Sequence, residues 1–161
     1  KNLKEAKRGE YELTDAIKAL SKKETVYCAE SKQWLPIGYP RDLLKADKIL
    51  RNNKNIIGKN SKISGKVENS SIGNNCTING QVRNSIIMDN STVDKNSIVR
   101  DSVIGENVYF SGKILSKKTK IGKFGAAIGD NSKIIKSVIN PGCRIWPDKQ
   151  VSNQAISGDL V

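Results

Sequence analysis

Three stretches of this sequence repeat one another at nearly regular spacing: Val67–Gly73 (VENSSIG), Val82–Met88 (VRNSIIM) and Val99–Gly105 (VRDSVIG). A shorter period of six residues surrounds them, in which an isoleucine is followed by glycine and, four positions after the isoleucine, by Ser, Cys or Val. It occurs as IGKNSK at 57–62, IGNNCT at 72–77, IGENVY at 104–109 and IGDNSK at 128–133. Short repeats of this kind indicate a solenoid in which each unit packs on the next.

Each six-residue unit predicts one short strand and a corner. The isoleucine points inward, the small residue fills the remaining interior, and Gly and Asn occupy corners that need unusual backbone angles. The fold class expected is therefore mainly β, a left-handed parallel β-helix of triangular section over residues 55–161. Its core should contain Ile57, Ile63, Ile72, Ile78, Ile87, Val93, Ile104, Ile128, Ile139, Ile145 and Val151.

One segment departs from the six-residue period, and the end of the chain has a separate role. The lysine-rich segment 111–123 predicts a loop or a distorted turn. The tail 152–161 is expected to close the last turn, because the end of a solenoid exposes unpaired strand groups that need a cover.

The segment 1–54 follows a different pattern and predicts a short α/β region. Apolar residues recur at helical spacing within 13–20 and within 43–50, and Pro40 suits the first turn of the second helix. Val26–Ala29 and Trp34–Leu35 are typical of short strands. These elements bury too little surface for an independent core, so we expect 1–54 to be the tail of a larger domain.

Composition narrows the classes of function. The formal charge is +12, from 28 Lys and Arg against 16 Asp and Glu, while aromatic residues make up 5%. The lysines are spread over outward positions and no aromatic platform for bases is visible, so we expect attraction for phosphorylated metabolites and no nucleic-acid partner. The sequence contains no histidine, which removes the commonest general base and metal ligand.

Cellular location and cysteine chemistry follow from two further observations. No apolar run approaches the length of a transmembrane helix or of a signal-peptide core, so we expect a cytoplasmic protein with no membrane partner. Cys28, Cys76 and Cys143 lack the spacing of a metal site, and the last two occupy inward small positions as apolar filler. The sequence begins at Lys1 and not at Met, and we expect it to be a fragment.

The order of several motifs resembles a known family. Glu10–Ile17 (EYELTDAI) and Trp34–Leu44 (WLPIGYPRDLL), followed by hexapeptide repeats, resemble the C-terminal end of sugar-1-phosphate nucleotidylyltransferases. The likeness is greatest to archaeal proteins that join a nucleotidyltransferase domain to a left-handed β-helix acetyltransferase domain. Asn84–Met88, Asp101–Asn107 and Lys123–Asn131 are similar to stretches characteristic of that family, and the resemblance covers nearly the whole chain.

The resemblance implies a reaction and an assembly. The complete protein is expected to join a nucleoside triphosphate to a sugar 1-phosphate with Mg²⁺, releasing pyrophosphate. The β-helix is expected to serve oligomerisation, as a homotrimer, and regulation. The Gly-rich phosphate loop and one metal-binding carboxylate are expected upstream of Lys1, so this chain alone should not catalyse the reaction.

The resemblance also implies candidate residues for the nucleotidyltransferase site. The family's Trp-x-Asp-x-Gly pattern has Pro36 at the position of its metal-binding Asp, and a proline side chain binds no metal. Asp42 is therefore the candidate Mg²⁺ ligand. Glu12 and Asp15 are candidates for the sugar-phosphate pocket, and a helix cap with a first-turn acid is the simpler structural interpretation.

In the acetyltransferase half, the resemblance places Lys95 at the catalytic histidine and Ile98 at the tyrosine three residues later. An exposed lysine is protonated at neutral pH and cannot accept a proton from an amine. The family's sugar-contacting loop corresponds here to the short segment 110–118. We expect loss of acetyl transfer, with Lys123 and Asn131 as candidates for binding a phosphorylated or CoA-like ligand.

Two alternatives remain open at the level of sequence. One is an acetyl-CoA-dependent sugar-phosphate acetyltransferase in which Lys95, Asp94 or Asp101 replaces the histidine as base. The other is a scaffold or binding module without chemistry of its own.

Overall fold

The computed structural model describes residues 9–119 and 122–161. The chain forms two compact units, Lys1–Trp34 and Leu35–Val161. The described part of the first unit contains one helix, α1 (Leu13–Leu20), as predicted. The strands predicted at Val26–Ala29 and Trp34–Leu35 are wrong, because these residues have no strand partner to take up their backbone N–H and C=O groups.

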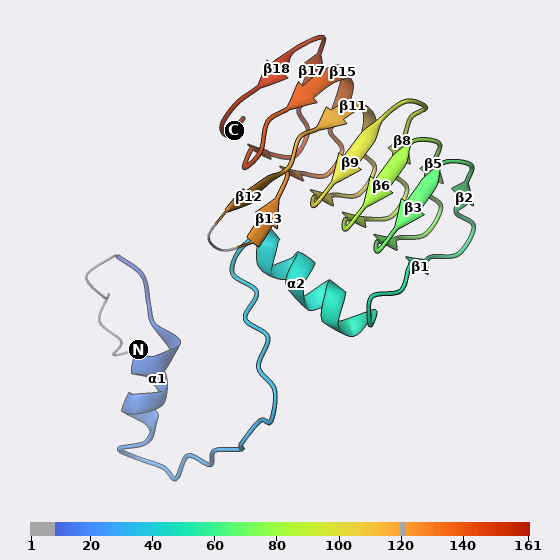
Figure 1. Ribbon diagram of the computed structural model, residues 1–161. Coiled ribbons are helices and arrows are strands. Elements are labelled where there is room, and N and C mark those ends of the chain that lie inside the picture. Colours follow the sequence, from blue (N-terminus) through green and yellow to red (C-terminus); the bar gives the residue numbers. More distant parts are fainter. Residues whose placement is uncertain (1–8, 120–121) are drawn as a thin grey trace. The chain divides into compact units, whose positions relative to one another are not determined.

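The second unit is a parallel β-solenoid with helix α2 (Pro40–Leu50) along one side (Figure 1). The first face of the solenoid is a six-stranded sheet with one strand from each of six turns. Its strands are β1 (Ile56–Ile57), β4 (Ser71–Ile72), β7 (Ile86–Ile87), β10 (Val103–Ile104), β14 (Ala127–Ile128) and β16 (Arg144–Ile145).

The other two faces belong to one ten-stranded sheet, because two long strands bend around the corner between them. The second face contains β2 (Lys62–Ile63), β5 (Thr77–Ile78), β8 (Thr92–Val93), the start of β11 (Tyr109–Ile114), the start of β15 (Lys133–Ile139) and β17 (Gln150–Ser152). The third contains β3 (Lys66–Glu68), β6 (Gln81–Arg83), β9 (Ile98–Arg100), the ends of β11 and β15, and β18 (Ala155–Ile156). This is the predicted left-handed β-helix of triangular section.

The register between turns follows the sequence repeats. Ile57, Ile72 and Ile87 stack at equal intervals along the sequence, and the next interval, to Ile104, is slightly longer. The following turn, which ends at Ile128, is the longest of the series because it carries an antiparallel hairpin of β12 (Lys117–Thr119) and β13 (Gly122–Phe124). The expected irregularity at 111–123 is therefore a hairpin that leaves the solenoid.

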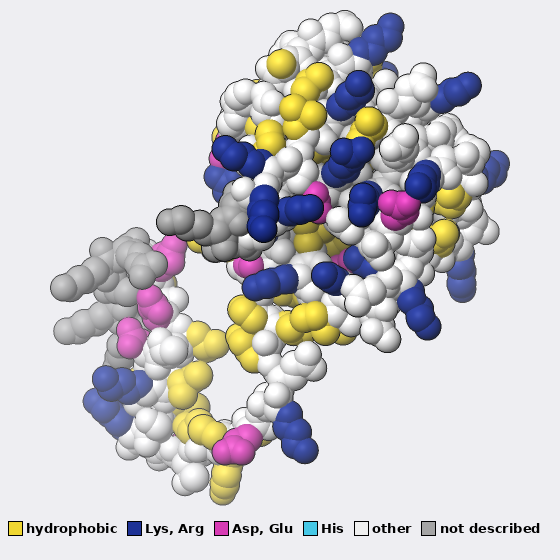
Figure 2. Space-filling view, in the orientation of Figure 1, with side chains coloured by type: hydrophobic (Ala, Val, Ile, Leu, Met, Phe, Trp, Pro, Cys, Tyr) yellow, Lys and Arg dark blue, Asp and Glu magenta, His cyan; other side chains and the backbone are white. Residues whose placement is uncertain are grey.

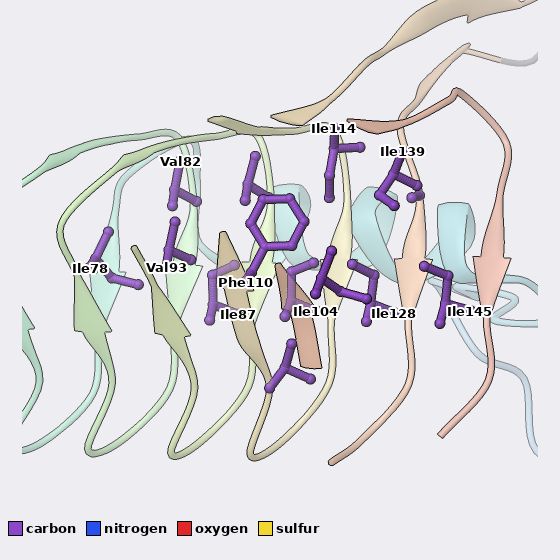
Figure 3. Packing of buried hydrophobic residues seen from close by; sticks show 14 of the residues in the cluster. Ile78, Val82, Ile87, Val93, Ile104, Phe110, Ile114, Ile128, Ile139 and Ile145 are labelled. Atoms are coloured by element: carbon purple, nitrogen blue, oxygen red, sulfur yellow. The ribbon is translucent and has the colours of Figure 1, made fainter. Parts of the chain in front are cut away.

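The core consists of stacked rows of aliphatic side chains (Figure 3). Nine of the eleven predicted core residues are at most 2% exposed: Ile72, Ile78, Ile87, Val93, Ile104, Ile128, Ile139, Ile145 and Val151. The prediction is wrong for Ile57, which is 48% exposed, and Ile63 is only partly buried. Both lie in the first turn, which has a neighbouring turn of the solenoid on one side only.

The sequence prediction also omitted part of the core. Val82 and Val99, the valines that precede Arg83 and Arg100, stack on the third face with Ile114 of the next turn, and all three are buried. Cys76 and Cys143 are buried free thiols, as expected of small inward side chains, and burial raises the pKa of both. The tail closes the last turn as expected, with Leu160 in a parallel bridge to Ile145 and β18 paired with β15.

Glycine and asparagine have separate roles at the corners. Asn75 and the equivalent asparagines of other turns have a positive φ, as predicted. The prediction that glycine supplies unusual angles is wrong for the Gly after each inward isoleucine, which does not have a positive φ. At Gly73, a Cβ atom would lie 2.3 Å from Oδ1 of Asp89 and 2.7 Å from its backbone nitrogen, so glycine is required by close approach of the next turn.

Polar groups fasten α2 to the solenoid. Asp47 accepts a hydrogen bond from the Ser71 hydroxyl. Its Oδ2 also forms an ion pair with Arg51, with 2.6 Å between this oxygen and the Arg51 Nε. Ala46 is buried, whereas Leu50, expected on the same apolar face, is 78% exposed.

Among the described residues, no helix has the length and apolar character needed to cross a membrane.

Candidate functional site

A cleft of about 950 Å³ lies where α2, the β12–β13 hairpin and the later turns of the solenoid meet. Figure 2 shows Lys and Arg side chains gathered around this hollow. Seven basic residues line it against three acidic ones, Asp42, Asp101 and Asp159. The basic residues are Arg41, Lys45, Lys48, Arg51, Lys117, Lys123 and Arg144. We call this space the basic cleft.

The carboxylates of the basic cleft are already bonded to protein donors. Asp42 caps α2 by accepting the backbone N–H of Tyr39 at 3.0 Å. Asp101 accepts hydrogen bonds from Nδ2 of Asn84 at 3.1 Å and from Oγ of Ser116 at 2.5 Å. These bonds hold both carboxylates against the walls of the cleft.

The third carboxylate belongs to an ion pair. The guanidinium of Arg144 bonds to Asp159, with 3.0 Å between Nε and Oδ2, and the Arg144 backbone N–H also donates to that carboxylate at 3.2 Å. The Arg144 side chain holds the pKa of Asp159 below its ordinary value. This pair is therefore nearly neutral as a unit and leaves the remaining charge of the cleft to the lysines.

Most of the basic side chains have no such partner. Within residues 9–119 and 122–161, Lys45, Lys48, Lys117 and Lys123 make no ion pair. They are exposed at the cleft and belong to two separate elements, α2 and the hairpin. A concave surface with an excess of charge of one sign concentrates counter-ions, so the cleft is suited to a multiply charged anion.

The structure brings two of the sequence candidates together. Lys123 and Asp42 both line the basic cleft, although most of the solenoid separates them in the sequence. Sequence reasoning missed the basic stripe of α2, formed by Arg41, Lys45 and Lys48. Its signal was present, because residues spaced by four and three positions share one face of a helix.

The other candidates lie elsewhere. Asn131 stands at a corner, where its amide accepts from Asn107 at 3.1 Å and donates to Asp148 at 3.0 Å. Glu12 precedes α1 and Asp15 lies in its first turn, and both are exposed in the first unit. Their binding roles stay predictions.

Lys95 is exposed at a corner of the solenoid. Its backbone N–H donates to Oδ1 of Asp94 at 2.8 Å, and Oδ2 of Asp94 accepts the hydroxyl of Tyr109 at 3.0 Å. That hydrogen bond raises the pKa of Tyr109. Both carboxylate oxygens of Asp94 therefore accept hydrogen bonds from nearby protein groups. The role of Lys95 as a base stays a prediction.

Asp42, the candidate Mg²⁺ ligand, is bonded to protein groups in this structure. Its carboxylate caps α2 and lies 4.0 Å from Nε of Arg41, a cation. No group of three His, Cys, Asp or Glu side chains in the described part of the chain is placed to hold a metal ion. Mg²⁺ is usually held by one or two carboxylates together with waters and substrate phosphates, and the role of Asp42 as its ligand stays a prediction.

Comparison with known proteins gives a family match over most of the chain. Residues 46–161, which include the second half of α2 and the whole solenoid, match the family described as "GMPPB C-terminal domain". A curated relative, "Bifunctional protein GlmU" of Methanococcus maripaludis, is 44% identical over 70 residues. That alignment covers 43% of this chain and only 16% of the relative.

A solved structure is also similar. It is PerB from Caulobacter crescentus, in complex with CoA and GDP-perosamine. The TM-score is 0.48 at 16% sequence identity, and the superposition covers 77% of this chain and 60% of that one.

Proposed function

This chain belongs to the GMPPB C-terminal domain family, and we propose from that premise that it is the C-terminal region of a sugar-1-phosphate nucleotidylyltransferase. The complete protein would join a nucleoside triphosphate to a sugar 1-phosphate with Mg²⁺. A phosphate oxygen of the sugar 1-phosphate attacks the α-phosphorus, the bond to the β-phosphate breaks, and pyrophosphate leaves. The observation that carries this proposal is the family match over residues 46–161.

The likeness to the bifunctional relative supports the same assignment, because that protein is 44% identical over the aligned segment. The motif order described above, with a helix-containing segment ahead of the repeats, adds a second line of support. We propose that residues 1–54 belong to the nucleotidyltransferase domain and that 55–161 form a separate β-helix domain.

The exposed apolar side of α1 supports the assignment of this helix to the nucleotidyltransferase domain. Leu13, Ile17 and Leu20 are all exposed, and the described part of α1 buries no residue. An amphipathic helix normally covers its apolar side against a core. We propose that the missing cover is the rest of the nucleotidyltransferase domain.

The β-helix is proposed to act in assembly and regulation, in a cytoplasmic homotrimer. Support comes from its flat sheet faces, which suit a closed cyclic arrangement. The absence of histidine from the sequence also favours a role other than acid–base chemistry for this region.

The test compares three proteins: the complete protein, the complete protein truncated after residue 54, and the 161-residue chain. Each is assayed for pyrophosphate release with a panel of nucleoside triphosphates and sugar 1-phosphates in Mg²⁺. We expect turnover by the complete protein, none by the isolated chain, and a changed oligomeric state after truncation. Pyrophosphate release by the isolated chain, or none by the complete protein with any pair, would contradict the assignment.

A further inference from the structure

The basic cleft has more positive charge than its own acids can balance, and the charge comes from three separate parts of the chain. α2 contributes Arg41, Lys45 and Lys48 from one face, the hairpin contributes Lys117 and Lys123, and the sixth turn contributes Arg144. Convergence of separate elements on one hollow differs from a solvated basic helix, in which the charges point away from other parts of the protein.

The placement of the acids strengthens this interpretation of the charge. Asp42 is occupied by the helix cap, and Asp159 by Arg144. Within the described residues, no ion pair joins these lysines to a carboxylate of the cleft. Lys and Arg bind phosphate oxygens through charge-assisted hydrogen bonds, and several of them on facing walls fit more than one phosphate group.

Aromatic side chains stand beside these cations. Tyr39 lines the cleft at the start of α2 and is exposed, and the guanidinium of Arg41 lies 4.7 Å from the centre of its ring. Phe124 lines the hairpin wall and is only partly buried. Aromatic rings and guanidinium planes are surfaces on which a nucleobase stacks.

The solenoid wall offers acceptors for hydroxyl groups. The structure gives the carboxylate of Asp101 two side-chain donors, Asn84 and Ser116, whereas a carboxylate has about four acceptor positions. The remaining positions can accept hydroxyl groups of a sugar. The volume of about 950 Å³ is large for inorganic phosphate and lies within the usual range for small-molecule sites, roughly 300–1,000 Å³.

We propose that the basic cleft is a binding site for a nucleoside diphosphate group, free or within a nucleotide sugar. The lysines of α2 and of the hairpin bind the two phosphates, the base stacks on the Tyr39–Arg41 pair, and Asp101 accepts ribose hydroxyl groups. The residues named for this site lie within 39–119 and 122–159 of one chain, and their binding does not depend on nucleotidyltransferase activity.

The experiment is isothermal titration of the 161-residue chain with ADP, GDP and UDP, and with inorganic pyrophosphate. The cleft variant is Lys45→Ala/Lys48→Ala. Its matched control is Lys59→Ala/Lys62→Ala, which removes the same charge from exposed positions at the first turn, outside the cleft. All four lysines are exposed, so we expect the variants to fold, and circular dichroism and thermal unfolding check this.

We expect at least one nucleoside diphosphate to bind with one site per chain. Because a hydrogen bond to a charged group contributes about 1.5–3 kcal/mol, the cleft variant should lose about tenfold or more in affinity, while the control stays within about twofold. Tyr39→Leu should weaken the nucleoside diphosphate and leave pyrophosphate unchanged, because only the base contacts the ring. A nucleotide sugar, compared with its nucleoside diphosphate, identifies which of the two occupies the cleft.

Three results would overturn the proposal. The first is the absence of saturable binding by all three nucleoside diphosphates. The second is an equal loss of affinity in the cleft variant and in the matched control, which would indicate a general charge effect. The third is pyrophosphate binding as tight as the nucleotides together with no effect of Tyr39→Leu, which would make the cleft a site for phosphate groups alone.

Discussion

Asparagine side chains continue from turn to turn along one corner of the solenoid. Nδ2 of Asn60 donates to Oδ1 of Asn75, and Asn75 donates to Asn90 in the same way, both at 3.3 Å. The left-handed backbone favours asparagine there, because its short polar side chain tolerates a positive φ. One residue type thus satisfies the backbone angle and the stacking of turns together.

Gly73, two positions before Asn75, meets a steric requirement that can be tested by substitution. Gly73→Ala places a Cβ atom against the next turn at Asp89, and we expect it to cost about 1–3 kcal/mol of unfolding free energy, the usual range for overpacking. Gly38→Ala is the matched control, since the nearest atom to its new Cβ is 4.0 Å away. Urea unfolding measures both, and equal stability of the two variants would contradict the close approach.

The Arg144–Asp159 pair predicts a dependence of stability on pH. Because Arg144 holds the pKa of Asp159 below its ordinary value of 3.8, the carboxylate stabilises the folded state fully above that value. Its contribution is lost as the pH falls through the lowered value in the folded state. Asp159→Asn should therefore be less stable than wild type at neutral pH, and the difference should shrink in acid.

Urea unfolding at steps from pH 7 to about pH 3 measures this difference. Glu30→Gln, at an exposed position of the first unit, is the control and should follow wild type throughout. A gap between wild type and Asp159→Asn that stays constant down to the lowest pH would show that the pair does not stabilise the fold through ionisation.

At the scale of elements, a row of buried serines links successive turns. The hydroxyl of Ser70 accepts a hydrogen bond from the backbone N–H of Ser85 at 3.1 Å. The hydroxyl of Ser85 accepts one from the backbone N–H of Ser102 at the same distance. Ser102 in turn accepts the N–H of Ala126 at 3.0 Å. The serine of the repeated stretches therefore bonds one turn to the next at a buried corner, where an unpaired N–H would be costly.

The inward isoleucines of the first face carry the apolar part of this stacking, and Ile87 tests it. Ile87 is almost fully buried between Ile72 and Ile104, so Ile87→Asp would place a carboxylate in an apolar interior. We expect the variant to be unfolded or insoluble, whereas Ile87→Val should lose only about 0.5–1.5 kcal/mol.

Lys62→Asp, at an exposed strand position, is the control for the introduced charge and should fold. Circular dichroism and thermal unfolding measure all three variants. An Ile87→Asp protein that is folded and as heat-stable as wild type would show that the register of the first face is wrong.

At the scale of the whole molecule, the solenoid presents long flat faces, and we predict that they associate into a homotrimer. The measurement is sedimentation equilibrium of the 161-residue chain at micromolar concentration. The expected result is a single species of three times the chain mass of 17.7 kDa, because a closed cyclic assembly has no open surface for further growth. A stable monomer under these conditions would contradict the prediction.

Loss of acetyl transfer by the solenoid is the second prediction at this scale. Lys95 is exposed at a corner, and the sequence contains no histidine that could serve as the base instead. We expect no turnover of acetyl-CoA with glucosamine 1-phosphate or galactosamine 1-phosphate. Lys95→His and Lys95→Ala are measured beside wild type, and turnover by wild type that Lys95→Ala abolishes would show that this lysine is the base.

Much of the solenoid could be predicted from the sequence because its contacts are nearly local. The partner of each strand lies one repeat away along the chain in most turns, so the repeat that encodes a strand also encodes its neighbour. The identity of the inward residues and the break in period at 111–123 follow from the same regularity. The exposure of Ile57 did not follow, because a repeat carries no information about which turn is the end.

The basic cleft, in contrast, could be recognised only from the tertiary structure. Its cations come from α2, the hairpin and the sixth turn, and no repeat relates these segments to one another. They meet because Asp47 bonds to Ser71 and holds α2 against the solenoid, and because the insertion folds back as a hairpin beside it. The short repeat by itself determined the β-helix, since stacking is local, whereas the cleft required long-range docking that composition and spacing do not encode.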